Sequence, residues 1–358
     1  MNELIIGLMS GTSLDGIDLV ACRFSKSTGS YDSFEILHAE TMPYSPIWKN
    51  KLSDSLHYSE AQIKILDLEY GEYLASCILK FINKHHIQPA LIGSHGHTIL
   101  HQPSKGITLQ IGNGQIINEL TKINVVNNFR YQDVVLGGQG APLVPIGDEL
   151  LFSSYDFCLN LGGFSNISYS ENKIRYACDI GPCNMLLNEL ANRSGFDYDS
   201  KGSIALSGNV IPDLFEKWNA YKFYKLVGPK SLGKEWFVEN FNKDIYNSEF
   251  EIKHLLRTAT EHISKIISDF IISKSSHKSY KVLVTGGGAH NDFLIKQLKE
   301  KSGESIEYII PDSNLIDFKE AMIFALLAQL KMDREINVLS SVTGAIKDHS
   351  SGDIWITD

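Results

Sequence analysis

An apolar segment followed by a glycine-rich turn with polar side chains occurs three times in this sequence. The turns are Ser10–Gly16 (SGTSLDG), Leu161–Asn166 (LGGFSN) and Thr285–Asp292 (TGGGAHND). A tight bend between strands needs only one glycine or asparagine, and a single glycine turn usually just redirects the chain. Three such turns favour an anion site, because glycine admits close backbone approach and successive N–H groups form a nest. The sequence has no GxxxxGK[ST] loop, so another group must neutralise a bound phosphate.

The segments around these turns predict an α/β chain made of two related halves. Each half opens with a strand, a glycine-containing turn and a second strand, and then alternates helices with strands. The spacing of apolar residues predicts helices at about 59–84, 251–273 and 318–332. Two α/β units of this kind would place a ligand where their strand turns meet.

The chain length limits the number of domains, and the net charge limits the classes of partner that the protein can bind. At 358 residues the chain fits roughly two domains of ~100–200 residues. We expect them at residues 1–127 with about 337–358 and at 128–336, facing each other across a cleft. A net charge of −9 without a basic run argues against nucleic acid or an anionic membrane as partner. No segment approaches the roughly 20 apolar residues of a membrane span.

The cysteines and the first residues favour a cytoplasmic protein. The five cysteines are an odd number and form no CxxC pair or Cys/His cluster that would hold zinc. The opening MNELIIGLMSG has neither the basic leader nor the long apolar run of a signal peptide. A homodimer is plausible, but nothing in the sequence identifies an interface.

Four segments together resemble the anhydro-N-acetylmuramic acid kinase family of the actin, sugar-kinase and heat-shock-protein superfamily. They are MSGTSLDGID (9–18), GGQGAPLVP (137–145), NLGGFSNIS (160–168) and DIGPCN (179–184). The resemblance extends from Gly7 to about Ala328. It implies two ribonuclease-H-like (actin-like ATPase) domains across a nucleotide cleft. It also implies that ATP and water open the 1,6-anhydro ring of a cell-wall amino sugar, giving N-acetylmuramic acid 6-phosphate and ADP.

The resemblance implies that the glycine-rich turns bind ATP. The residues it assigns are Gly11, Thr12, Ser13, Leu14, Asp15, Gly16, Ile17 and Asp18 in the first turn, and Gly162, Gly163, Gly286 and Gly287 in the other two. Asp15 or Asp18 suits Mg²⁺ bound through water, since hard carboxylates are its usual protein ligands. The metal and the backbone amides would then replace the missing lysine. The alternative for Asp15 is a carboxylate that only caps the turn.

Two carboxylates are expected to act on the substrate. In RYACDIGPCN (175–184), Asp179 is expected at the end of an apolar strand, and it matches the aspartate of the family's DTGPGN stretch, which implies a general base. Ile180 and Cys183 depart from the threonine and glycine of that pattern, and we expect Cys183 to be a packing residue. Glu320 begins an apolar helix and matches a family glutamate that faces the sugar ring. The alternatives are that Asp179 only fixes a loop and that Glu320 is an exposed charge favoured by the helix dipole.

The sugar is expected to meet residues of the first half and its border. SHGHT (94–98) matches the family's SHGQT stretch, so His95 and His97 would donate to sugar hydroxyls or to the lactyl carboxylate. Arg130 suits a carboxylate or phosphate, and Asp133 suits sugar hydroxyls or an ion pair with Arg130. The polar segment Pro229–Phe237 matches only part of the family, and we assign it no role beyond closure on the substrate side.

Two other functions fit the same motifs. A kinase of this fold that acts on an intact sugar would also need a carboxylate base, and only product analysis separates it from a ring-opening enzyme. A non-catalytic nucleotide-binding switch would need an attached partner-binding domain or an exposed interaction surface, and we expect neither from this sequence. For either enzyme we expect the domains to close on the ligand, because closure excludes bulk water.

Overall fold

The computed structural model describes residues 3–11, 14–27, 29–226, 228, 230–246, 249–274 and 279–357. The chain divides into two compact units, Met1–Ser153 with Phe318–Asp358 and Ser154–Asp317. Residues 128–153 and 318–336 thus lie in the first unit, whereas sequence reasoning assigned them to the second domain. One reason is aromatic packing, because the ring of Phe152 lies 5.4 Å from that of Phe34.

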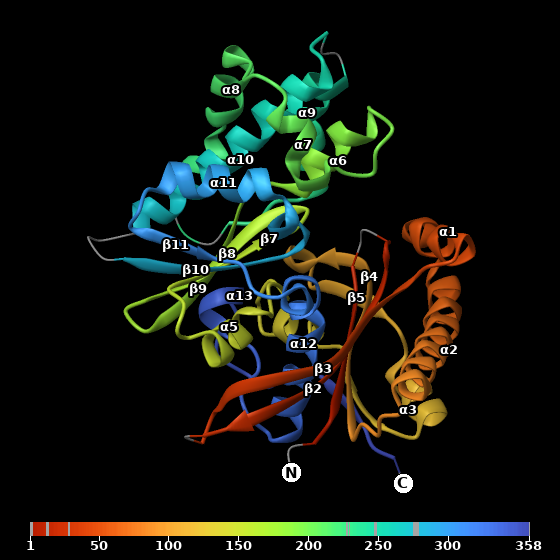
Figure 1. The fold of residues 1–358 in the computed structure, drawn as a ribbon. Coiled ribbons are helices and arrows are strands. Elements are labelled where there is room, and N and C mark those ends of the chain that lie inside the picture. Colours follow the sequence, from red (N-terminus) through yellow and green to blue (C-terminus); the bar gives the residue numbers. More distant parts are fainter. Residues whose placement is uncertain are drawn as a thin grey trace. The chain divides into compact units, whose positions relative to one another are not determined.

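The first unit contains a mixed sheet with the strand order β12-β6-β4-β1-β2-β3, and β5 pairs with β4 (Figure 1). The strands are β1 (Ile5–Ser10), β2 (Gly16–Lys26), β3 (Tyr31–Pro43), β4 (Leu91–Gln102), β5 (Ile107–Ile111), β6 (Asn124–Asn127) and β12 (Asp353–Trp355). Strands β1, β2 and β3 form an antiparallel meander. Strand β4 is parallel to β1 on its other side, and β6 is parallel to β4.

The second unit repeats this plan with the strand order β11-β10-β7-β8-β9. The strands are β7 (Phe157–Leu161), β8 (Phe164–Glu171), β9 (Ile174–Pro182), β10 (Tyr280–Thr285) and β11 (Ile306–Ile309). Strands β7, β8 and β9 form the meander, and β10 and β11 continue the sheet in parallel from β7. The two halves therefore share one topology, and the expected pair of ribonuclease-H-like α/β units is confirmed.

The helices follow the apolar periodicity of the sequence. In the first unit they are α1 (Pro46–Asp54), α2 (Glu60–His85), α3 (Gly114–Thr121), α4 (Tyr131–Val135), α5 (Pro145–Leu151) and α13 (Ser340–Thr343). In the second unit they are α6 (Asn184–Asn192), α7 (Ser203–Leu206), α8 (Pro212–Asn219), α9 (Lys234–Tyr246), α10 (Ile252–Lys274) and α11 (Asp292–Ser302). Helix α12 (Ser313–Met332) begins before the expected residue 318, because the Asp312 carboxylate accepts a hydrogen bond from the N–H of Leu315 at 3.0 Å.

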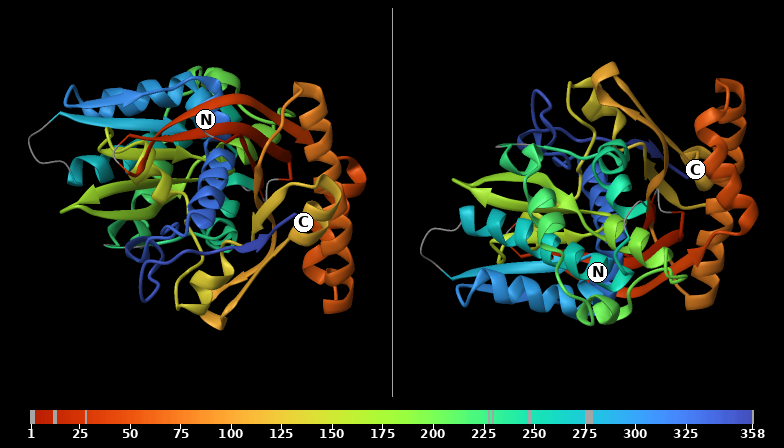
Figure 2. Two further views of the ribbon diagram at one scale, coloured as in Figure 1. Left: turned by 90° about the horizontal axis from the view of Figure 1, so that it is seen from below. Right: turned by 90° about the horizontal axis from the view of Figure 1, so that it is seen from above.

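Helix α12 lies directly on the first sheet. A Cβ atom at Gly7 of β1 would be 1.9 Å from the carbonyl oxygen of Ala321, and one at Gly93 of β4 would be 2.2 Å from that of Phe324. The alternate residues of β1, such as Ile6, pack with α2 on the opposite face. The two helices thus cover opposite faces of this sheet (Figure 2).

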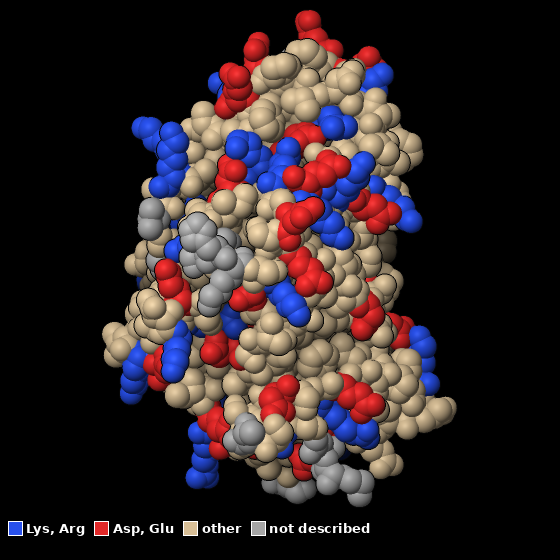
Figure 3. All heavy atoms as spheres, turned by 60° about the vertical axis from the view of Figure 1, so that its left-hand side comes forward, with Lys and Arg blue, Asp and Glu red and all other residues tan. Residues whose placement is uncertain are grey.

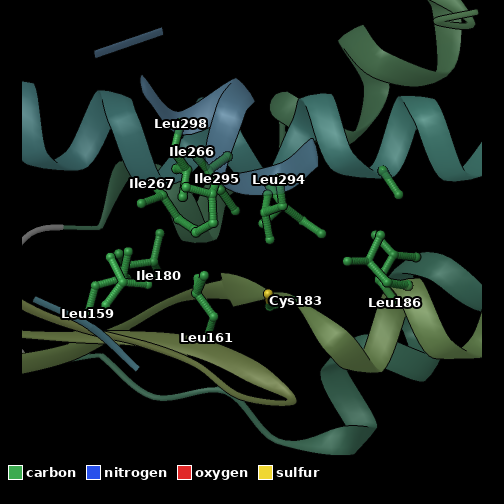
Figure 4. Packing of buried hydrophobic residues seen from close by; sticks show 14 of the residues in the cluster. Leu159, Leu161, Ile180, Cys183, Leu186, Ile266, Ile267, Leu294, Ile295 and Leu298 are labelled. Atoms are coloured by element: carbon green, nitrogen blue, oxygen red, sulfur yellow. The ribbon is translucent and has the colours of Figure 1, made fainter. Parts of the chain in front are cut away.

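The second unit has a separate hydrophobic core between its sheet and helices α10 and α11 (Figure 4). Leu159 and Leu161 of β7 face Ile267 of α10 and Leu294 of α11. Cys183 is fully buried in this cluster, as expected of a packing residue.

On the face drawn in Figure 3, acidic and basic side chains are interspersed. Among the described residues, no helix combines the length and the apolarity needed to cross a membrane.

Replacing Gly93 by alanine is expected to lower the free energy of unfolding by about 1–3 kcal/mol, because the methyl group would overlap the α12 backbone. Equilibrium unfolding in urea measures the change. Ser94→Ala, at the next residue, is the matched control. The Ser94 side chain is also buried, and its Oγ has no hydrogen-bond partner among the described residues. Wild-type stability in Gly93→Ala would contradict the close approach of helix and sheet.

Candidate active site

The carboxyl ends of the parallel strands β1 and β4 form the first part of the site. Ser10, the last residue of β1, pairs with His97 of β4, and Gly11 follows immediately. The N–H of Leu14 donates to the carbonyl of Gly11 at 3.4 Å, and Leu14 has a φ of 59°. Thr12 and Ser13 lie outside the described residues. Ligands of open α/β sheets bind at this edge.

The remaining residues of this turn divide into core and surface positions. A Cβ at Gly16 would be 2.5 Å from the carbonyl oxygen of Met42, so the fold itself requires this glycine. Ile17 is fully buried in the core and can offer a ligand only its backbone. Asp15 is exposed. Asp18 is half-buried and accepts a hydrogen bond from the Thr41 hydroxyl at 2.5 Å. Among the described residues of this turn, the polar side chains able to reach a ligand are therefore the two carboxylates.

His95 holds Arg130 through a hydrogen bond between two side chains. The Nε–H of Arg130 donates to Nε2 of His95 at 2.9 Å, and Nδ1 of His95 lies 2.9 Å from the carbonyl oxygen of Gly96. Because arginine only donates and a carbonyl only accepts, His95 must be neutral with its proton on Nδ1. Desolvation, assisted by the charge of Arg130, holds the pKa of His95 well below its usual value. Both ring nitrogens are thus engaged, so His95 orients Arg130.

Asp133 fastens the glycine-rich segment that follows it. Its Oδ2 accepts from the N–H of Gly140 at 2.6 Å, and its Oδ1 accepts from the Thr343 hydroxyl at 2.6 Å. The side chain is fully buried. Arg130 donates instead to the carbonyl of Gly140 at 2.8 Å, and the described residues show no ion pair between Arg130 and Asp133. In this structure Asp133 is a structural carboxylate with both oxygens occupied.

Asp18, Arg130 and Glu320 come from β2, a loop and α12. Glu320 interacts electrostatically with the other two, and we call the three residues the carboxylate–arginine cluster. Glu320 is accessible to solvent. Desolvation by the surrounding protein raises the pKa of Glu320, and the negative charge of Asp18 adds to this shift. The positive charge of Arg130 opposes it. The sheet topology therefore brings together three of the expected site residues.

The carboxylates of the first unit suit a hydrated magnesium ion. Among the described residues, no group of three or more histidine, cysteine, aspartate or glutamate side chains could hold a metal ion alone. Mg²⁺ usually keeps several waters and binds one or two carboxylates together with substrate phosphates. The exposed Asp15 and the half-buried Asp18 fit that requirement.

In the second unit, the β7–β8 turn is tied to the start of α6. The N–H groups of Asn184 and Met185 donate to the carbonyls of Gly162 and Gly163, both at 3.0 Å. The Asn184 side chain donates to the carbonyl of Leu161 at 2.8 Å. The sequence analysis quoted Asn184 as the end of the DIGPCN segment but did not predict that it holds the β7–β8 turn.

The glycines of the second unit differ in what the fold requires of them. Gly286 has a φ of 80°, and a Cβ there would be 2.3 Å from the Asn160 side-chain oxygen. At Gly287, the first residue of the short helix η5 (Gly287–His290), the nearest atom to an added Cβ is 3.6 Å away. At Gly163 the nearest atom is 3.8 Å away. The fold therefore explains Gly286, whereas Gly163 and Gly287 leave room for a ligand.

Asp179 lies in β9 and has one oxygen fixed by a neighbouring loop. Its Oδ2 accepts from the N–H of Leu232 at 2.8 Å and from the Ser231 hydroxyl at 3.3 Å. No described residue hydrogen-bonds to Oδ1. Desolvation raises the pKa of Asp179, and the hydrogen bonds from Leu232 and Ser231 and the charge of Lys230 oppose that shift.

The loop that fixes Asp179 belongs to the polar segment to which sequence reasoning gave no catalytic role. Pro229 lies outside the described residues, and Lys230, Ser231 and Leu232 precede α9. The carbonyl of Lys230 also accepts from the N–H of Asp179 at 2.9 Å. Only the Gly and Ser content of the segment hinted at this contact.

Two ribonuclease-H-like units, with glycine turns and carboxylates at the ends of their strands, define an ATP-using phosphotransferase of the actin-like class. The chain belongs to the anhydro-N-acetylmuramic acid kinase family, whose family model matches residues 3–357. Membership confirms the resemblance seen in the motifs. The family's reaction is ring-opening phosphorylation of the anhydro sugar in cell-wall recycling.

Relatives of this family match the chain over nearly its whole length. It is 33% identical over 377 residues to the anhydro-N-acetylmuramic acid kinase of Acinetobacter baylyi, covering 96% of this chain and 97% of that protein. It is 34% identical over 391 residues to that of Gloeothece citriformis, covering 98% of each. Among solved structures, the activator of the 2-hydroxyisocaproyl-CoA dehydratase from Clostridium difficile with bound ADPNP has 12% identity and a TM-score of 0.44, covering 91% of this chain and 94% of that chain.

Gly287→Ala is expected to leave the free energy of unfolding unchanged and to raise KM for ATP roughly tenfold, because its methyl group fits the fold but would meet the nucleotide. Steady-state kinetics and urea unfolding measure the two effects. Gly286→Ala is the comparison variant and should lose stability, since its Cβ would meet Asn160. An unchanged KM in Gly287→Ala would remove this turn from the nucleotide site.

Proposed function

We propose that this chain carries out its family's reaction with Asp179 as the general base and Mg·ATP as the phosphoryl donor. A water molecule attacks the anomeric carbon and gives a proton to Asp179. The bond from that carbon to O6 breaks, and O6 takes the γ-phosphoryl group, releasing ADP. The products are N-acetylmuramic acid 6-phosphate and ADP. Atoms and charge balance when the proton that Asp179 takes from water is counted with them.

The hydrogen bonding of Asp179 is the observation that supports this role. The N–H of Leu232 fixes Oδ2 at 2.8 Å and thereby sets the orientation of the carboxylate. Oδ1 has no partner among the described residues and is left to accept a proton from water. The raised pKa makes Asp179 a stronger base than an ordinary aspartate. A base positioned in this way typically contributes about 10²–10⁴-fold.

We propose that the glycine turns of both units bind ATP. Gly11 and the backbone after it, together with Gly162, Gly163 and Gly287, would supply N–H groups to the phosphates. Asp15 or Asp18 would hold Mg²⁺ through water, and the bound metal neutralises the phosphate charge that a lysine would otherwise meet. Because ATP is the donor, we place the reaction in the cytoplasm.

We assign the sugar to the carboxylate–arginine cluster. Arg130 donates to two neutral acceptors, His95 and the Gly140 carbonyl, so its charge is not matched by a bonded carboxylate. Its guanidinium therefore suits the lactyl carboxylate of the sugar. Glu320 is accessible and would accept hydrogen bonds from the sugar ring.

The wild-type enzyme, incubated with Mg·ATP and 1,6-anhydro-N-acetylmuramic acid in ¹⁸O-labelled water, is expected to give a phosphorylated product with one label at C1. Asp179→Asn should lower kcat by about 10²–10⁴-fold, because the amide cannot take the proton from water. Mass spectrometry reads both results. An untouched anhydro sugar with unlabelled phosphorylation of an intact amino sugar would favour the simpler kinase. Nucleotide binding without any product would favour the switch.

Ser231→Ala should shift the acidic limb of the pH–kcat profile to higher pH. The Ser231 hydroxyl lowers the pKa of Asp179, so its loss raises that pKa further and the base becomes protonated at a higher pH. At a pH on that limb the variant should be slower than wild type, and at alkaline pH the two should converge. Ser273→Ala, on the exposed end of α10, is the control. Superimposable profiles would argue against Asp179 as the titrating base.

A further inference from the structure

A row of polar side chains crosses the second sheet from β7 to β9. Asn160 of β7 pairs with Asn166 of β8, and Asn166 pairs in turn with Asp179 of β9. Directly opposite residues of antiparallel strands point to the same face, with Cβ atoms about 4.5–5.5 Å apart. The three side chains therefore lie side by side, and all three residues are half-buried.

The neighbouring row of the sheet shows which face the polar row occupies. Leu159, Ile167 and Cys178 are paired in the same manner and belong to the hydrophobic core that includes residues of α10 and α11. Because successive residues of a strand alternate between faces, Asn166 and Asp179 lie on the face away from this core. Packing of the core therefore does not explain an amide and a carboxylate at these positions.

One end of the row lies beside the glycine turns that are proposed to bind ATP. A Cβ atom at Gly162 would be 3.2 Å from the Asn160 side chain, and one at Gly286 would be 2.3 Å from its oxygen. The other end of the row is Asp179, the proposed base. Asn166 thus lies between the turns that would hold the phosphates and the carboxylate that would accept a proton.

The side chain of Asn166 and Oδ1 of Asp179 are both left without a partner. The two residues lie directly opposite each other in β8 and β9, and no described residue hydrogen-bonds to either of these groups. Two neighbouring polar groups that do not bond directly can share one water molecule. The pair can therefore offer such a water two acceptors, the amide oxygen of Asn166 and the carboxylate oxygen of Asp179.

Two acceptors orient a nucleophilic water better than one. A water molecule held by a single carboxylate oxygen still rotates about that hydrogen bond. When the second O–H is held by the amide oxygen of Asn166, a lone pair of the water has a fixed direction for attack. Donation from the amide N–H to the water would instead withdraw electron density from the nucleophile, so the amide oxygen is the suitable partner.

Resting on the proposed function, we infer that Asn166 is a further catalytic residue, whose side-chain oxygen accepts a hydrogen bond from one O–H of the attacking water while Oδ1 of Asp179 takes the other proton. The bond from the water oxygen to the anomeric carbon forms as the bond from that carbon to O6 breaks. Asp179 keeps the transferred proton, and O6 takes the γ-phosphoryl group of ATP. The proton held by Asn166 stays on the new C1 hydroxyl.

Competition between water and methanol tests this arrangement in the intact enzyme. Methanol has a single O–H, and its methyl group would lie where the second O–H of water meets Asn166. With the anhydro sugar and Mg·ATP in a water–methanol mixture, each attack by methanol gives the methyl glycoside 6-phosphate. Asn166→Ala should raise the ratio of this product to N-acetylmuramic acid 6-phosphate about two- to tenfold over the wild type, read by mass spectrometry. An equal ratio in the two proteins would overturn the inference.

Kinetic constants separate a contact with water from a contact with the substrates. Asn166→Ala should lower kcat about 10–100-fold and leave KM for the sugar and for ATP within about twofold, because the lost contact is to the water. A wild-type kcat would overturn the inference. A rise in KM for the sugar as large as the fall in kcat would do the same, since Asn166 would then bind the sugar.

Asn166→Asp gives a readout that a merely structural role would not move. Its carboxylate keeps an acceptor for the water but adds a negative charge opposite Asp179. Like charges disfavour ionisation, so the pKa of Asp179 rises and the acidic limb of the pH–kcat profile should move to higher pH. At alkaline pH this variant should be faster than Asn166→Ala. An unmoved limb, or no gain over Asn166→Ala at alkaline pH, would count against the inference.

Asn192→Asp, at an exposed position of α6, adds the same charge and is the matched control. Its product ratio and pH profile should equal those of the wild type. The wild type tests the proposed function separately, because an untouched anhydro sugar would overturn that function and the inference with it. Turnover that depends on Asp179 but not on Asn166 would overturn the inference alone.

Discussion

The direct contact between α12 and the first sheet fixes the geometry of the carboxylate–arginine cluster. Gly7 and Gly93 remove the side chains that would hold the helix away, and the backbone carbonyls of Ala321 and Phe324 occupy that space. A helix seated on backbone has little freedom to slide. Since Glu320 precedes the first of these contacts by one residue, the contacts hold its backbone in place, and its side chain interacts with the charges of Asp18 and Arg130. The absence of side chains at Gly7 and Gly93 thus allows the close contact that fixes the position of α12 relative to the site.

The positive charge of Arg130 bears on which sugar the site favours. Arg130 is a half-buried cation whose hydrogen-bond acceptors, His95 and the Gly140 carbonyl, are both neutral. Asp133 is close in sequence, but its oxygens hold the N–H of Gly140 and the Thr343 hydroxyl. Removing a cation in part from water without a bonded anion costs free energy. A bound anion would offset that cost, so the arrangement favours binding of a carboxylate-bearing sugar over a neutral one.

The sequence predicted the repeated topology and the long helices, because strand turns and apolar periodicity are local signals. It did not separate His95 from His97, which both flank one glycine. Gly96 has a φ of 73°, and the pairing of β1 with β4 shifts register nearby. As a result the His95 ring packs on Phe324 of α12, and the His97 ring packs on Tyr70 of α2. The partners of the two histidines come from distant segments, so no local pattern could assign them.

Glycines carry functional information only after packing has been accounted for. Gly7, Gly93 and Gly286 are explained by backbone or side-chain atoms that leave no room for a Cβ. Gly163 and Gly287 are not, because the nearest atoms to an added Cβ are 3.8 and 3.6 Å away. The β7–β8 turn and the turn after β10 both border Asn184 or its neighbour Met185. A phosphate chain needs space beside backbone amide groups, and the fold leaves such space at these two turns, which supports the proposal that they bind ATP.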